Sequence, residues 1–150
     1  MDDIPHSKTS TQNLERVLSG IAAALCLFGC LWVGQTLSHT QPIWPLPALY
    51  LFEAALVSIL GWLAVLKSGA SSSPFSAPAI WAAAGILAAF VVIGLWSIGL
   101  LFVPVSALFF ITAILVDHRQ KNSIFLHLGI GALAAAAQIA LMLFIVRFLI

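Results

Sequence analysis

Residues Ile80–Val116 read IWAAAGILAAFVVIGLWSIGLLFVPVSALFFITAILV and contain no charged side chain and no His, Asn or Gln. An α-helix rises about 1.5 Å per residue, so one straight helix over this stretch would be about 55 Å long. The hydrocarbon core of a bilayer is only about 30 Å thick. Gly94–Gly99, followed by Pro104, offers a place to reverse direction. The stretch therefore predicts a tight hairpin of two membrane helices.

The composition places the whole chain in a membrane. It has 150 residues, of which 62% are hydrophobic and 7% charged, whereas soluble domains average about 25% charged residues. The mean hydropathy is +1.12. A formal net charge of +1 and the lack of a basic run argue against nucleic acid as a partner. We expect membrane lipids to surround an all-α integral membrane protein.

Working outward from the hairpin gives five transmembrane helices behind a polar lead at residues 1–15. Their expected bounds are 16–37, 46–66, 79–96, 101–116 and 123–148, and together they make one helical domain over 16–150. Prolines at 42, 45 and 47, a Ser/Gly/Pro-rich stretch at 68–78 and a charged connection at 117–122 separate them. A cleaved signal peptide is the alternative for the first apolar run, but the lead carries acids and no clean cleavage site follows.

Positive charges predict the orientation. An N-terminus inside the cell puts five Lys or Arg residues on the inner side, namely Lys8, Arg16, Lys67, Arg119 and Lys121, against Arg147 alone outside. One unbroken helix over 80–116 would give three on each side. The count favours the hairpin, a cytoplasmic N-terminus and an outer C-terminus, and we expect a bacterial plasma (inner) membrane. The five tryptophans also fall near the predicted boundaries: Trp32, Trp44 and Trp96 outside, Trp62 and Trp81 inside.

Small side chains mark two helix faces. Those on the first helix recur at spacings of 4, 3, 4 and 4, and those on the second lie one turn apart; they are Ser19, Ala23, Cys26, Cys30 and Gly34, then Ser58 and Gly61. Such faces allow close helix–helix approach. We interpret the two cysteines as small packing residues, because their i, i+4 spacing suits neither a disulfide nor a C-x-x-C site.

Glu53 is the only acid inside an apolar segment. A carboxyl group at such a depth costs about 2.5–3.5 kcal/mol on translocon-type scales. Gln138 and Ser106 fall at a similar depth, which predicts a polar cluster joining the second, fourth and fifth helices. Two alternatives are a proton or cation site at Glu53, and a contact between Glu53 and a cation on another subunit.

The remaining polar residues favour topology over chemistry. We expect Arg119, Lys121 and Lys67 to be lipid-facing charges that set orientation; the alternative is that the 117–121 segment binds an anionic lipid or a soluble partner. His118 and His127 are interpreted as interfacial residues. Because the chain has neither a metal-binding nor a catalytic motif, we expect no metal, no cofactor and no enzyme activity.

These patterns favour a small accessory or assembly subunit of a larger membrane complex, respiratory, photosynthetic or involved in transport. It would act by helix–helix contacts with other transmembrane subunits. The first alternative is a stand-alone transporter or proton-coupled channel built on Glu53. The second is a membrane enzyme or cofactor binder that uses His118 and His127.

Overall fold

The computed structural model describes residues 6–39, 46–70, 75–95 and 98–149. In these ranges the chain forms five α-helices and one short 3-10 helix, and no strand. They are α1 (His6–Ser38), α2 (Leu46–Ala70), α3 (Ser76–Ile93), η1 (Gly99–Phe102), α4 (Val103–Gln120) and α5 (Ile124–Leu149). All five α-helices are long and apolar enough to cross a membrane. The prediction of an all-α bundle of five transmembrane helices is confirmed.

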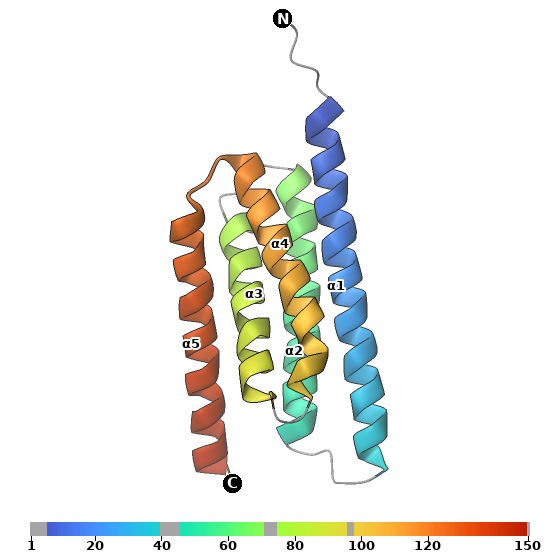
Figure 1. The fold of residues 1–150 in the computed structure, drawn as a ribbon. Coiled ribbons are helices and arrows are strands. Elements are labelled where there is room, and N and C mark those ends of the chain that lie inside the picture. The colour runs from blue at the N-terminus through green and yellow to red at the C-terminus, as the bar shows by residue number, and fades with distance from the viewer. Residues whose placement is uncertain (1–5, 40–45, 71–74, 96–97, 150) are drawn as a thin grey trace, which may run out of the picture.

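The chain reverses direction between α3 and η1, as the opening stretch predicts (Figure 1). The Gly99 N–H donates to the Gly94 carbonyl oxygen at 2.6 Å. A Cβ on Gly94 would lie 2.8 Å from the Gly99 nitrogen, so the two backbones approach too closely for a side chain. Pro104 lies in the first turn of α4, where its missing N–H has no partner to lose. Trp96 and Ser97 are outside the described residues.

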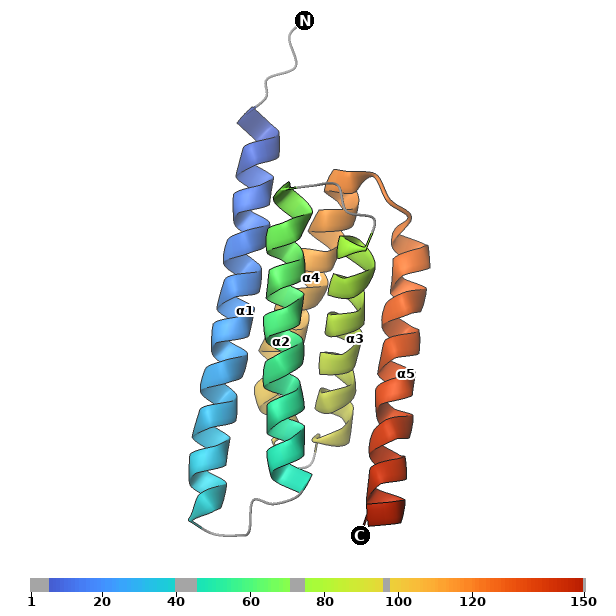
Figure 2. The same ribbon diagram turned by 180° about the vertical axis from the view of Figure 1, so that it is seen from behind.

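Helices α1 to α4 form a ring in which each packs mainly against two neighbours, and α5 packs outside it on α3 (Figures 1 and 2). The sequence of neighbours around the ring is α1, α2, α3, α4 and back to α1. The N-terminal end of α1 and the C-terminal end of α5 lie at opposite ends of the bundle. Since α3 touches α2, α4 and α5, it is the most enclosed of the five helices.

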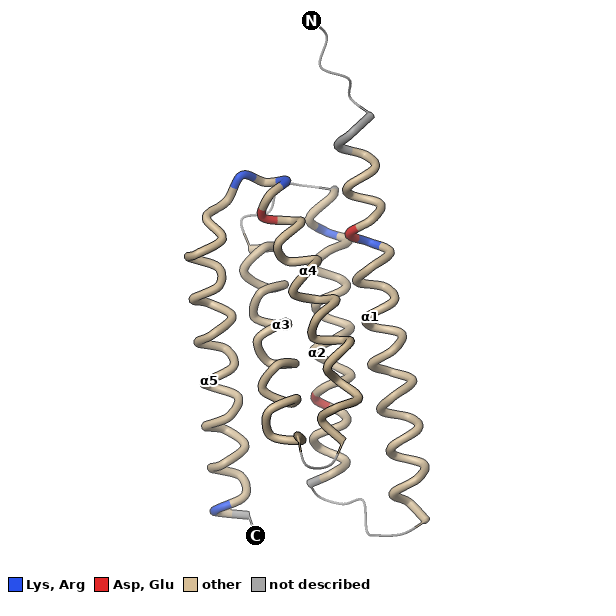
Figure 3. Tube along the Cα trace, in the orientation of Figure 1, with Lys and Arg blue, Asp and Glu red and all other residues tan. Residues whose placement is uncertain are grey.

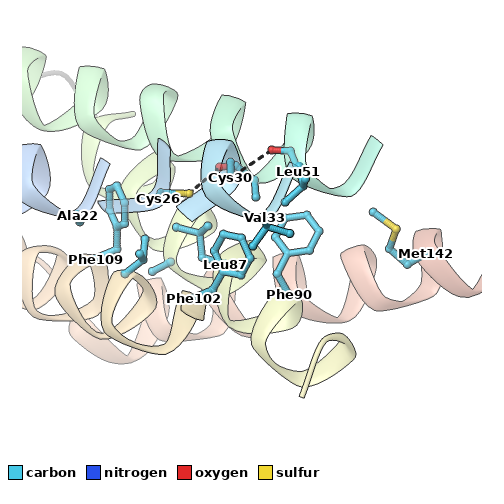
Figure 4. Packing of buried hydrophobic residues seen from close by; sticks show 13 residues of the cluster. Ala22, Cys26, Cys30, Val33, Leu51, Leu87, Phe90, Phe102, Phe109 and Met142 are labelled. Atoms are coloured by element: carbon cyan, nitrogen blue, oxygen red, sulfur yellow. Dashed lines mark hydrogen bonds between the residues drawn. The ribbon is translucent and has the colours of Figure 1, made fainter. Parts of the chain in front are cut away.

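The core is built from aromatic, aliphatic and small residues of α1 to α4, together with Met142 of α5 (Figure 4). Phe90 and Phe109 are fully buried, and Tyr50 of α2 stacks edge-on against Phe90 with ring centroids 4.5 Å apart. The Tyr50 hydroxyl donates to the Phe90 carbonyl oxygen at 2.7 Å, near the end of α3. A second cluster around Val65, Ile80 and Trp81 fills the end of the bundle nearer the N-terminus.

Two glycine contacts set the closest helix approaches. Gly85 of α3 meets the backbone of Gly131 in α5, and a Cβ on Gly85 would overlap the Gly131 carbonyl. On α2, a Cβ on Gly61 would lie 2.8 Å from Phe109 Cε1 and 3.0 Å from the Ala83 Cβ. Small residues here let apolar helices pack closely, which is the main source of association inside a bilayer.

Several helix ends differ from the sequence-based bounds, among them both ends of α3, which runs from Ser76 to Ile93 where 79–96 was expected. Helix α1 begins at His6, so most of the expected lead at 1–15 is helical, and α2 continues to Ala70. Helix α4 continues to Gln120, through most of the segment expected to be a loop. Hydropathy marks where a helix leaves the hydrocarbon, but a helix continues beyond that point when its polar residues find partners, as they do at this end of the bundle.

Candidate functional site

The last turn of α4 places two charged residues on different sides of the helix. Asp117 faces α3 and α5, and Arg119 faces α1 and α2, while His118 between them is exposed. All three lie at the end of the bundle where Lys and Arg residues gather (Figure 3). Residues two positions apart on a helix point about 200° away from each other, so the last turn of α4 can contact the helices on its two opposite sides.

Asp117 is fully buried and binds two neighbours. The Trp81 Nε1–H of α3 donates to Oδ2 at 2.7 Å. His127 Nδ1, in the first turns of α5, lies 2.7 Å from Oδ1. Both carboxylate oxygens are therefore satisfied by hydrogen bonds, and three helices are joined at one point.

Arg119 forms a two-pronged ion pair with Glu15 of α1. Its Nε lies 2.9 Å from Oε1 and its Nη2 2.9 Å from Oε2. The Glu15 side chain is 0% exposed and that of Arg119 is 17% exposed. Arg119 Nη2 also donates to Ser68 Oγ of α2 at 3.2 Å. Planar guanidinium–carboxylate pairs of this kind are among the stronger polar contacts in proteins.

We call this group the α4 clamp; it consists of Glu15, Ser68, Trp81, Asp117, Arg119 and His127. Its members come from all five α-helices. The end of α4 is fixed locally by Lys121, which has a left-handed φ of 56°. The Asn122 N–H donates to the Asp117 carbonyl oxygen at 3.1 Å, which closes the helix in the manner of a Schellman motif. The arrangement holds the five helices together at this end of the bundle, because most polar side-chain atoms in it are hydrogen-bonded to another member of the clamp.

The clamp corrects two expectations. Arg119 does not face lipid, since its guanidinium points into the bundle towards Glu15. Trp81 is 2% exposed and serves as a buried donor, so it does not belong to a tryptophan belt at the membrane boundary. Lys67 and Lys121 are exposed. The sequence does contain a signal for this contact, because Glu15 and Arg119 carry opposite charges on the same predicted side of the membrane. Counting only the Lys and Arg residues on each side did not reveal it.

The small residues of α1 pack towards α2, whereas Gly61 of α2 lies against Phe109 of α4 and Ala83 of α3. Ser19, Ala23, Cys26 and Cys30 are buried and Gly34 is half-buried on α1; Ser58 and Gly61 are buried on α2. The Cys26 thiol donates to the Ala54 carbonyl oxygen at 3.5 Å and the Cys30 thiol to that of Leu51 at 3.4 Å (Figure 4). Both cysteines are free thiols. Their role in this chain is to let α1 and α2 approach closely.

The structure does not bring Glu53, Gln138 and Ser106 together. Helix α3 lies between α2 and α5, and no hydrogen bond joins these three side chains. Gln138 and Ser106 are buried, and Gln138 Nε2 has no hydrogen-bond partner. Glu53 is half-buried and makes no polar contact within the described residues. Counting residues along helices gave a common depth but could not give the lateral order of the helices.

The chemistry of the described residues is limited in other respects. They contain no group of three or more His, Cys, Asp or Glu side chains that could hold a metal ion. An apolar groove between α1 and the start of α4 is lined by Leu25, Phe28, Gly29, Trp32, Leu101 and Pro104.

Comparison with protein-family models, curated proteins and solved structures finds no match to this chain.

Proposed function

We propose that this chain is a non-catalytic membrane subunit that packs against the transmembrane helices of other proteins in a larger complex. The α4 clamp supports this proposal because its polar groups are occupied in joining the chain's own helices. What is left for an external partner is the apolar outer surface and one acid within the membrane-spanning part, Glu53.

The position of Glu53, and its lack of a polar partner among the described residues, is the observation on which the proposal rests. It lies six residues after Pro47, the first residue of the apolar span of α2, which is about 9 Å along the helix. Its neighbour Phe52 is 67% exposed, so Glu53 borders the face of α2 that points out of the bundle. A half-buried carboxyl at that depth, with no polar partner among the described residues, is costly unless another molecule supplies one. A donor or cation on a partner helix would offset that cost.

The outer face of α5 adds to this support. Helix α5 packs almost entirely on α3, and its opposite side carries exposed small residues at helical spacing: Gly129, Ala132, Ala136 and Ala140. A Cβ on Gly129 would meet nothing within 4 Å. Small residues on a membrane helix surface favour contact with a second helix.

The orientation belongs to the same proposal. Arg16, Lys67, Arg119 and Lys121 lie at the N-terminal end of the bundle, and Arg147 lies at the other end (Figure 3). By the positive-inside rule, the clamp would face the cytoplasm. A bacterial plasma membrane is the setting that we propose.

The test is native mass analysis after extraction from its own membrane in a mild detergent. The wild-type chain is expected to migrate with larger subunits, and Glu53→Gln is expected to reduce that fraction several-fold while leaving the melting temperature of the isolated chain unchanged. The matched control is Asn122→Asp, which changes an exposed polar residue away from the apolar span and should leave the assembly intact.

A lone monomer or homo-oligomer for the wild-type chain would contradict the proposal. In that case the chain, reconstituted in liposomes, should be tested for proton or cation flux. Flux that Glu53→Gln abolishes would favour the transporter alternative, since an unpaired intramembrane acid also suits that activity.

A further inference from the structure

Arg16 stands beside the α4 clamp but takes no part in it. Its Nε atom is buried and has no hydrogen-bond partner, and its guanidinium forms no ion pair with any described residue. Glu15, the residue that precedes Arg16 in the sequence, binds Arg119 through both of its carboxylate oxygens. An unsatisfied buried donor on a charged group is costly, and in a native protein it calls for an explanation such as a bound ion.

The surroundings of Arg16 form a seam between α1 and the last turn of α2. Gln12, one helical turn earlier, and Arg16 both lie against Gly69: a Cβ there would overlap the Gln12 amide and would lie 2.8 Å from Arg16 Nη2. One turn deeper, Trp62 Nε1 lies 3.5 Å from the place of a Cβ on Gly20. The seam thus offers a guanidinium and a side-chain amide at its mouth, with an indole ring below.

The local charge favours an anion. Arg16, the exposed Lys67 and Arg119 lie close to the end of α2, and among the described residues the only carboxylate paired with any of them is that of Glu15, with Arg119. Arg16 itself is half-buried, so part of its side chain reaches the surface. The seam lies where α2 leaves its apolar span, which ends at Gly69. Lipid headgroups occupy this level of a membrane.

We infer that the seam binds the phosphate group of an anionic phospholipid, with Arg16 and Gln12 as donors. A guanidinium pairs with phosphate oxygens through parallel N–H···O bonds, and such a pair would give the Arg16 Nε donor the partner that it lacks within the chain. Basic sites between transmembrane helices on the cytoplasmic side commonly take anionic headgroups. The Trp62 indole, beside the acyl-chain boundary, would lie against the glycerol region.

The experiment titrates the full-length chain in detergent with phosphatidylglycerol or phosphatidylcholine and counts bound lipids by native mass spectrometry. We expect one phosphatidylglycerol to bind in preference to phosphatidylcholine. Arg16→Gln should weaken its binding at least about tenfold, the effect of losing a charge-assisted hydrogen bond. Because Arg16 makes no internal ion pair, this variant should keep the wild-type melting temperature in phosphatidylcholine.

Two further variants distinguish specific binding at the seam from nonspecific attraction of the lipid to the positive charge at this end of the bundle. Lys121→Gln removes an exposed charge at the same end and should bind phosphatidylglycerol as the wild type does. Gly69→Ala keeps every charge but displaces the Gln12 and Arg16 side chains, and should weaken binding. Unchanged binding by Arg16→Gln or Gly69→Ala, or an equal loss in Lys121→Gln, would overturn the inference.

A final arm addresses the source of the phosphate. Inorganic phosphate in excess is expected neither to raise the melting temperature nor to displace phosphatidylglycerol. Displacement by inorganic phosphate would show that the seam takes a free anion and would overturn the assignment to a lipid. None of these outcomes depends on whether the chain joins a larger complex.

Discussion

Glu15 and Arg119 are 104 residues apart in the sequence, yet they form an ion pair in which the Glu15 side chain is fully buried. The pair lies at the rim of an apolar bundle, and Arg119 also donates to Ser68 Oγ. Burying two charges gives little net stability when both are present, but removing one partner leaves the other uncompensated. The pair therefore makes folding sensitive to single substitutions at either position.

The first prediction concerns that sensitivity. Glu15→Gln should lower the free energy of unfolding by about 3 kcal/mol, the lower end of the range for breaking a buried pair, because the Arg119 side chain is 17% exposed. Unfolding in mixed micelles with increasing sodium dodecyl sulfate measures the change. Lys121→Gln, at an exposed position nearby, should leave the curve where it is. Equal effects of the two substitutions would mean that the ion pair has no special role.

Helix α5 is the element with the least support. It contacts α3 along its length and α4 only near their connection, and most of its large apolar side chains are exposed. Two of its contacts can be tested one at a time, the backbone approach of Gly131 to Gly85 and the hydrogen bond between His127 and Asp117. One is a packing contact inside the apolar span and the other a polar contact at its edge, so each can be removed separately.

Gly85→Ala should detach or shift α5. The added methyl group would overlap the Gly131 carbonyl, which is backbone and cannot move without the whole helix, so we expect a loss of about 2–3 kcal/mol. The matched control is Gly129→Ala, where the new Cβ meets nothing within 4 Å and the gain in helix propensity is up to about 1 kcal/mol. Amide hydrogen exchange in α5 measures the effect of each substitution. If α5 is as well protected in Gly85→Ala as in the wild type, the close approach of Gly85 to Gly131 is contradicted.

For the molecule as a whole, the sequence predicted what depends on one segment at a time. The presence of five apolar helices, the reversal near Gly94 and the small-residue faces are local properties, and they appear in the structure. The lateral order of the helices is not local, so Glu53 and Gln138 share a depth without being neighbours. Partners such as Trp81 and Asp117 could not be predicted either, because hydropathy identifies polar residues but does not identify which helix supplies the matching group.

The sidedness of the whole bundle gives the last prediction. In a chain with Cys26 and Cys30 replaced by Ala, single cysteines at exposed positions 121 and 147 lie at opposite ends. The excess of Lys and Arg at the first end predicts that a membrane-impermeant maleimide added to intact cells labels Arg147→Cys and spares Lys121→Cys. Inside-out vesicles should give the reverse pattern. Labelling of Lys121→Cys from outside would place the α4 clamp on the outer surface, and with it the anionic-lipid seam, where the positive-inside argument no longer holds. Labelling of both from one side would be incompatible with a membrane crossing by α5, the only helix between the two positions.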